Sequence, residues 1–285
     1  MRSGRAFAGL AGLAACAAAA LFFSSIGSRY FVGEYSATVG GLPELLYVTL
    51  ADALVLAMVG ICALWPGRVG RVGVAMAVPV CLGVASGRYS VWLGVVRDEV
   101  EWSTLGPAFR MQLGAGAVAG AAGAAAVVAV VLLGRRRHGL DGWSRAASLV
   151  GVVGVACYAL GTAGDWYGYR TYDGVSVTVR AAGGTPAGSI TSDPGFIALL
   201  VTLAACALAV GLVRPRAVAV GLACGIVLHS AVAAAADLGV FSGSFVADSG
   251  VSPTSLYLWR IAADLCAIAA LGCILRSRGP QFGAG

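Results

Sequence analysis

The chain has 285 residues, of which 59% are hydrophobic and only 11% charged, with a formal net charge of +6. This composition excludes an ordinary soluble domain, because most of the folded surface must face lipid or other apolar helices. The positive charge does not indicate nucleic-acid binding, since the arginines stand in short clusters at the ends of apolar runs. We therefore expect an integral membrane protein whose surroundings are the lipid bilayer, with no nucleic-acid partner.

Eight stretches are long and apolar enough to cross a bilayer as helices. About 20 apolar residues span a hydrocarbon core of about 30 Å, and a helix satisfies every backbone polar group internally. The sequence predicts an all-α polytopic membrane protein with eight transmembrane helices. In chain order the spans run from Arg5 to Ile26, Leu45 to Trp65, Val72 to Val95, Met111 to Gly134, Ala146 to Gly164, Phe196 to Val213, Ala217 to Phe241 and Thr254 to Leu275.

The first stretch also resembles a signal peptide, because it follows two arginines and contains the small residues Ala18, Ala19 and Ala20. The apolar run continues past these alanines through Leu21 and Phe22, and seven further spans follow. We therefore expect an uncleaved first span.

The distribution of arginine predicts the orientation of the spans. With the N-terminus inside, the inner segments hold twelve arginines and a single acid, Asp141, whereas the outer loops hold six arginines and nine acids. The six outer arginines are Arg29, Arg88, Arg97, Arg110, Arg170 and Arg180. We expect a multi-pass protein of the plasma membrane with both termini in the cytoplasm.

The second half of the chain resembles the first in its polar outer loops. Three short segments recur in the same order, namely 29–33 with 170–174, 36–39 with 176–179, and 40–43 with 183–186. The pattern predicts two tandem four-helix repeats, residues 1–142 and 143–285. An even number of spans in each repeat makes the copies parallel. Parallel repeats occur in transporters and in fused dimers alike, so they indicate architecture more than mechanism.

The long outer loops carry alternating β-branched and aromatic residues bounded by glycine, as in Tyr172–Arg180. Such alternation is typical of a short strand or hairpin. We therefore expect short β-hairpin-like segments in the outer loops.

Ionisable residues inside spans are candidate functional residues, because each costs about 2.5 to 3.5 kcal/mol at the centre of a helix. In a functional interpretation they line an outward-facing pocket, in which Asp52 or Asp264 binds a cation or proton and Arg260 holds an anion or balances an acid. In a structural interpretation Arg260 and Asp264 neutralise each other one helical turn apart. The candidates are Asp52, His229, Asp237, Arg260 and Asp264.

His229 lies in the middle of its span and is followed by Ser230. A hydrolase would need this imidazole to activate a serine across a helix interface, whereas a lone membrane histidine more often serves as a hydrogen-bond donor in helix packing.

All eight cysteines fall inside apolar runs without metal-ligand spacing, so we expect buried free thiols, no metal site and no cofactor.

Three classes of function remain open. The first is a non-enzymatic membrane component that contacts a membrane-protein partner or a second copy of itself through its outer loops. The second is a permease for a small solute or ion that uses the outer aspartates. The third is an intramembrane enzyme centred on His229.

Overall fold

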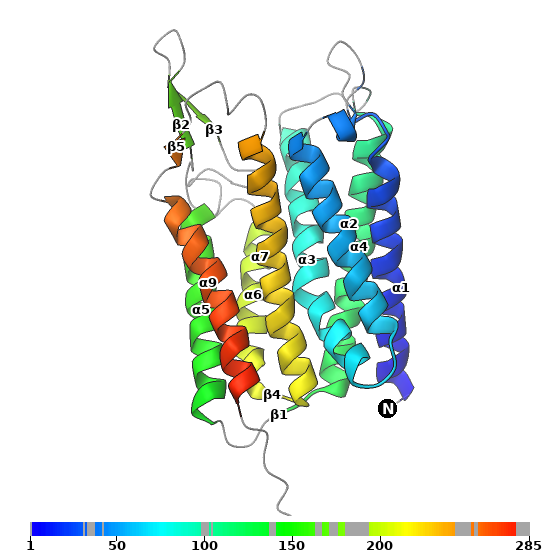
Figure 1. The fold of residues 1–285 in the computed structure, drawn as a ribbon. Helices are drawn as coiled ribbons and strands as arrows, with labels where there is room; N and C mark the ends of the chain where they lie inside the picture. Colours follow the sequence, from blue (N-terminus) through cyan, green and yellow to red (C-terminus); the bar gives the residue numbers. More distant parts are fainter. Residues whose placement is uncertain are drawn as a thin grey trace, which may run out of the picture.

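The computed structural model of the chain describes residues 2–30, 32, 38–41, 43–97, 103, 105–136, 141–162, 167–170, 176–179, 194–242, 252–253 and 256–277. In these ranges the fold is almost entirely helical (Figure 1). The eight long helices are α1 (Arg2–Ser25), α2 (Pro43–Leu64), α3 (Arg68–Arg97), α4 (Pro107–Leu133), α5 (Gly142–Thr162), α6 (Pro194–Leu212), α7 (Arg216–Ser242) and α9 (Leu256–Arg276).

All eight predicted spans are confirmed as helices that are long and apolar enough to cross a membrane. Three of the six arginines counted with the outer loops lie in helices, Arg88 and Arg97 in α3 and Arg110 in α4. Arg88 lies well inside α3 and also within the predicted span Val72–Val95, so its assignment to an outer loop is wrong. The helix accommodates Arg88 because this arginine is paired within the protein, as described below.

The helices form two groups of four, which stand side by side in Figure 1. In the first bundle α1 packs on α2 and α4, and α3 packs on the same two helices, so the four form a ring. In the second bundle α5 packs on α6 and α9, and α7 packs on the same two helices. Chain order around the ring is therefore the same in both bundles.

The two bundles meet mainly along α3 and α7, with further contacts of α2 on α7 and of α3 on α6. Glycines allow this close approach. A Cβ added at Gly225 would lie 2.5 Å from the Pro79 ring, and one added at Gly83 would lie 2.4 Å from Nδ1 of His229. Small residues are typical of helix interfaces in membranes, where close packing replaces the hydrophobic driving force.

The glycine-rich helix α4 also packs closely on a neighbouring helix. A Cβ at Gly116 would lie 2.6 Å from Cβ of Arg88, and one at Gly123 would lie 2.6 Å from the Leu82 side chain. The glycines of α4 therefore face α3 within the first bundle. The eight cysteines are free thiols, as predicted, but only Cys81, Cys157 and Cys206 are buried and the other five are half-buried.

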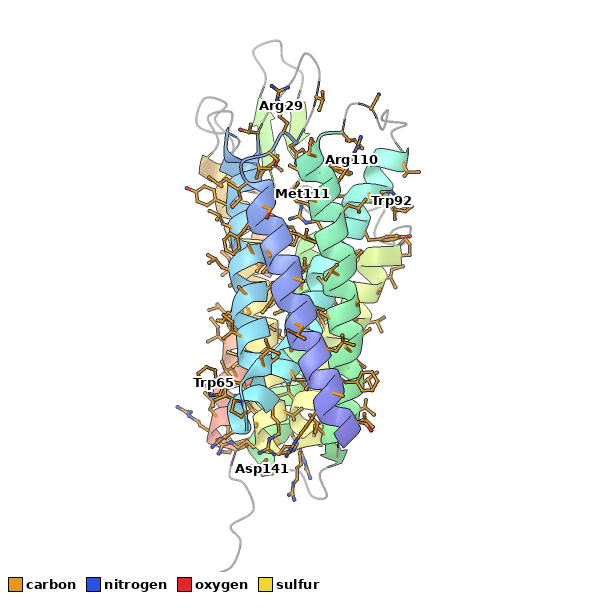
Figure 2. All side chains as sticks on the ribbon, turned by 90° about the vertical axis from the view of Figure 1, so that its right-hand side faces the viewer. Arg29, Trp65, Trp92, Arg110, Met111 and Asp141 are labelled. Atoms are coloured by element: carbon orange, nitrogen blue, oxygen red, sulfur yellow. The ribbon has the colours of Figure 1, made fainter. Side chains whose placement is uncertain are left out.

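The ends of the molecule differ in chemistry. Arg29 and Arg110 lie toward one end, whereas Trp65 and Asp141 lie toward the other (Figure 2). The end with Trp65 and Asp141 also holds the N-terminus and the last turn of α9 (Figure 1). We call it the basic end, because it carries the arginines of the short strands β1 (Arg135–Arg136) and β4 (Val213–Arg214). Here β1, which follows α4, pairs antiparallel with β4, which follows α6. This short ladder joins the two bundles.

The opposite end carries the larger connections. Tyr30 packs edge-on against Phe109, with 5.6 Å between ring centroids, in a small core that also contains Val39 and Leu105. Beside the second bundle, β2 (Tyr167–Arg170) pairs antiparallel with β3 (Ser176–Val179) and with β5 (Ser252–Pro253). Most of the remaining outer-loop residues lie outside the described ranges.

Candidate functional site

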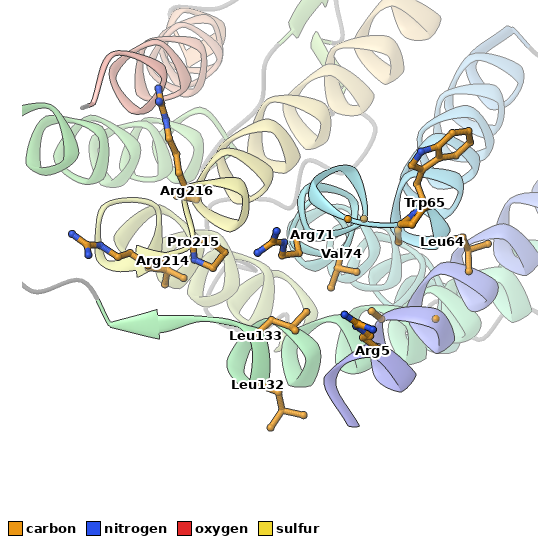
Figure 3. Close-up of a pocket in the computed structure, with 18 of the residues that line it drawn as sticks. Arg5, Leu64, Trp65, Arg71, Val74, Leu132, Leu133, Arg214, Pro215 and Arg216 are labelled. Carbon is orange, nitrogen blue, oxygen red and sulfur yellow. The ribbon is translucent and has the colours of Figure 1, made fainter. Parts of the chain in front are cut away.

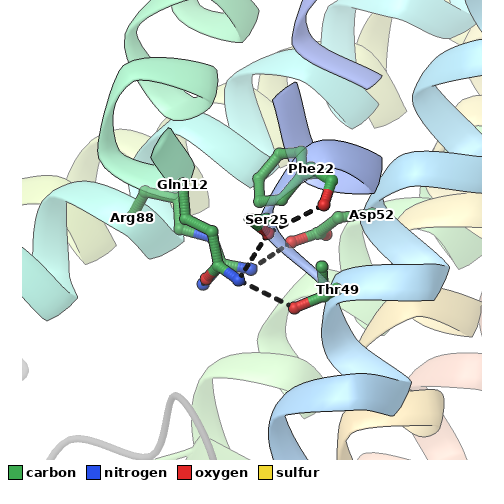
Figure 4. Close-up of polar contacts among 6 residues, drawn as sticks. All are labelled: Phe22, Ser25, Thr49, Asp52, Arg88 and Gln112. Carbon is green, nitrogen blue, oxygen red and sulfur yellow. Dashed lines mark hydrogen bonds and ion pairs between the residues drawn. The ribbon is translucent and has the colours of Figure 1, made fainter. Parts of the chain in front are cut away.

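Asp52 is the counter-ion of Arg88 in the core of the first bundle (Figure 4). The Asp52 Oδ2 and Arg88 Nη2 atoms are 2.6 Å apart, and the side chains are only 6% and 11% exposed. The guanidinium also lies over the Phe22 ring, with its Cζ 4.8 Å from the centroid. Burial makes this pair costly to separate, because either charge alone would be left in an apolar environment.

Gln112 extends the ion pair into a network that joins all four helices of the first bundle. It accepts a hydrogen bond of 2.8 Å from Arg88 and donates to the hydroxyls of Ser25 and Thr49, at 3.2 and 2.9 Å. The Ser25 hydroxyl in turn donates to the Phe22 carbonyl at 2.7 Å. These polar groups satisfy one another, so the network holds the helices in register. That Asp52 binds a cation or proton stays a prediction.

Three of the other predicted residues come together in the second bundle. His229 and Arg260 are buried, and Asp264 is half-buried. The Arg260 guanidinium lies 4.0 Å from the centroid of the Tyr158 ring, and the His229 ring lies 5.8 Å from the same ring. Ser230 hydrogen-bonds to the Asp264 carboxylate. Arg260 thus lies close enough to act electrostatically on both Asp264 and His229.

The fifth predicted residue, Asp237, belongs to α7, but its side chain lies outside the described residues. The predicted set therefore does not form one outward-facing cluster in the described part of the chain. Asp52 lies in the core of the first bundle, while His229, Arg260 and Asp264 lie in the core of the second.

A large cavity lies at the basic end and has a volume of about 1050 Å³. We call it the basic cavity. It lies between the bundles, where the first turns of α1, α3 and α7 meet the last turns of α2, α4 and α9. Its lining combines four arginines (Arg5, Arg71, Arg214 and Arg216) with apolar residues that include Leu64, Trp65, Val74, Leu132 and Leu133.

The charges of the basic cavity are all positive, because none of its lining residues is an acid. Arg216 extends toward α9 (Figure 3), where it donates to the carbonyls of Ile274 and Leu275. Arg71 points from α3 toward Pro215 (Figure 3). Within the described residues, the side chains of Arg5, Arg71 and Arg214 make no hydrogen bond or ion pair.

The positive charge of the basic cavity comes from its arginine side chains. The first turns of α1, α3 and α7 and the last turns of α2, α4 and α9 all border the cavity, so positive helix N-termini and negative helix C-termini offset one another. Arginine side chains are suited to an anion, and phosphate matches the guanidinium fork in geometry.

Sequence reasoning missed this cavity. The arginines of the predicted cytoplasmic turns indicate the orientation of the spans, whereas the residues predicted to form a site are those within the spans. The signal was present in the two short turns, Trp65–Arg68 and Arg214–Arg216, but hydropathy does not show that both turns border one cavity.

The chain matches no protein-family model, no curated protein and no solved structure. The described residues contain no cluster of three or more potential metal ligands. The eight apolar helices make the chain a multi-pass helical membrane protein.

Proposed function

We propose that this protein is a non-enzymatic component of the plasma membrane that binds a phosphate-bearing lipid headgroup in the basic cavity. The observation that carries the proposal is a cavity with four arginines and no acid among its lining residues. Basic cavities between transmembrane helices on the cytoplasmic side are typical sites for anionic headgroups.

A lipid suits this cavity better than a soluble phosphate compound, because much of the lining is apolar. Leu64 and Leu132 remain 44% and 54% exposed, beside the arginines. These side chains provide a surface for the first methylene groups of an acyl chain, while the guanidinium groups hold the phosphate. The cavity also lies at the ends of the spans, where headgroups are found.

The excess of arginine over acids at the basic end supports a cytoplasmic location for this end and for both termini. The matching ring order of the bundles supports an origin by tandem duplication, with residues 1–142 and 143–285 as parallel four-helix repeats. Contact with a membrane-protein partner or a second copy through the outer loops remains a prediction.

The permease alternative is weakened for Asp52, because its carboxylate is already neutralised by Arg88. It retains support only from the second bundle, where Asp264 is half-buried.

An intramembrane hydrolase centred on His229 is less well supported. Such an enzyme needs a serine hydroxyl bonded to the imidazole, whereas Ser230 hydrogen-bonds to Asp264.

The proposal is tested by replacing the three arginines that have no partner within the described residues. The triple variant Arg5→Gln, Arg71→Gln, Arg214→Gln is compared with a control triple, Arg68→Gln, Arg145→Gln, Arg276→Gln. The control removes the same charge from the same end but leaves the cavity lining intact. Binding is measured by mass spectrometry of the purified protein with phosphatidylglycerol, with phosphatidylcholine and with soluble glycerol phosphate.

We expect the unmodified protein and the control triple to retain phosphatidylglycerol in preference to phosphatidylcholine. Each arginine near an anionic surface contributes about 1 kcal/mol, so loss of three weakens retention by about a hundredfold. Binding of glycerol phosphate as tight as that of the lipid would redirect the proposal to a soluble ligand. Equal loss in both triple variants would overturn it.

A further inference from the structure

The two bundles differ in how completely their polar cores are satisfied. In the first bundle Asp52, Arg88 and Gln112 are joined by ion-pair and hydrogen-bond contacts. In the second bundle the Nε2 atom of His229 and the Oδ1 atom of Asp264 are buried without a hydrogen-bond partner among the residues that the structure describes. Buried polar atoms of this kind are rare, and an ordered water is a common reason for them.

A small cavity borders the unsatisfied histidine. It has a volume of about 20 Å³ and is lined by residues of α5, α6, α7 and α9. His229, Ser230 and Tyr158 are its polar lining residues, and Ala263 and Ala267 form the wall from α9. Because a water molecule needs about 10 to 15 Å³ of such volume and two to four polar partners, this cavity is the right size for one water.

The charges around the small cavity and its size exclude occupants other than water. A metal cation is disfavoured because the Arg260 guanidinium acts on both His229 and Asp264. A halide is opposed by the nearby Asp264 carboxylate, and an organic ligand does not fit in about 20 Å³. Water fits either tautomer of the histidine, because it can donate to Nε2 or accept from it.

We propose that this cavity binds one water molecule, which bridges His229 to Ser230. Ser230 already hydrogen-bonds to Asp264, so the water completes a hydrogen-bonded chain from the buried imidazole to the half-buried carboxylate. The site is separate from the basic cavity and independent of the proposed lipid binding. The bridge also explains how the imidazole ring is held against Gly83 of α3, where a Cβ would have no room.

The experiment uses the full chain with His138→Gln, which leaves His229 as its single histidine. Protein labelled with ¹⁵N-histidine is placed in bilayers, and solid-state NMR measures the transfer of magnetisation from water to the imidazole nitrogens. We expect a strong transfer to Nε2. A second sample carries Ala267→Val to fill the cavity, and its matched control carries Ala270→Val. Both alanines are buried in α9, at 4% and 3% exposure, but only Ala267 lines the cavity.

Ala267→Val should reduce the water signal at Nε2 to the background, whereas Ala270→Val should leave it unchanged. Ser230→Ala provides a second variant if Ala267→Val does not fold, and it should lower the signal by removing one partner of the water. Absence of water transfer in the parent protein would overturn the proposal. An unchanged signal in the cavity-filling variant would do the same.

Discussion

The buried ion pair between Asp52 and Arg88 allows the sharpest stability prediction. Asp52→Asn keeps the shape of the side chain but removes its charge, and Arg88 is then left buried without a counter-ion. Breaking a buried pair by removing one partner costs about 3 to 5 kcal/mol. We expect a loss near 3 kcal/mol, at the lower end of that range, because Arg88 keeps its hydrogen bond to Gln112.

The double variant Asp52→Asn, Arg88→Met separates this electrostatic cost from the loss of packing. It removes both charges, so its loss should be smaller than the sum of the two single losses by about 2 kcal/mol. The measurement is chemical unfolding of the purified protein in detergent micelles. Thr202→Val is the control, since Thr202 is half-buried on α6 and its hydroxyl bonds only to its own helix; it should change the free energy of unfolding by less than about 0.5 kcal/mol.

Two outcomes would contradict this reasoning. If Asp52→Asn costs less than about 1 kcal/mol, the pair is more hydrated than its 6% and 11% exposure indicates. If the losses of the two single variants simply add in the double variant, Asp52 and Arg88 do not depend on each other, and the ion pair does not hold the first bundle together.

Three further predictions concern single positions. Gly83→Ala should destabilise the protein by about 1 to 3 kcal/mol, because the new Cβ meets the His229 ring. Gly87→Ala, one turn further along α3 with nothing within 4 Å, should not destabilise it in the same unfolding assay. Gly67→Ala should cost about 1 to 2 kcal/mol, because Gly67 has a φ of 78°; a melting temperature equal to that of the parent would refute this. Burial raises the pKa of Tyr30, against the opposing charge of Arg88. The unfolded chain therefore loses the phenolic proton first, and stability should fall as pH rises above about 10, a dependence that Tyr30→Phe should weaken in unfolding measured across that pH range.

The sequence by itself determined the class of protein and the position of its eight spans. Hydropathy is a local property, because a helix that crosses lipid must be apolar along about 20 residues whatever its neighbours are. The free cysteines could be predicted for the same reason, since all eight lie within single apolar stretches.

Only the tertiary structure decided which polar residues meet. Arg88 falls within a predicted span but was counted with the outer-loop arginines, because its bond to Asp52 depends on how α2 and α3 are rotated toward each other. The basic cavity and the contact of Gly83 with His229 likewise require the two bundles to be packed together. Hydropathy along the chain contains no information about rotation of one helix against another, and this rotation determines whether a buried charge is neutralised or left open to a ligand.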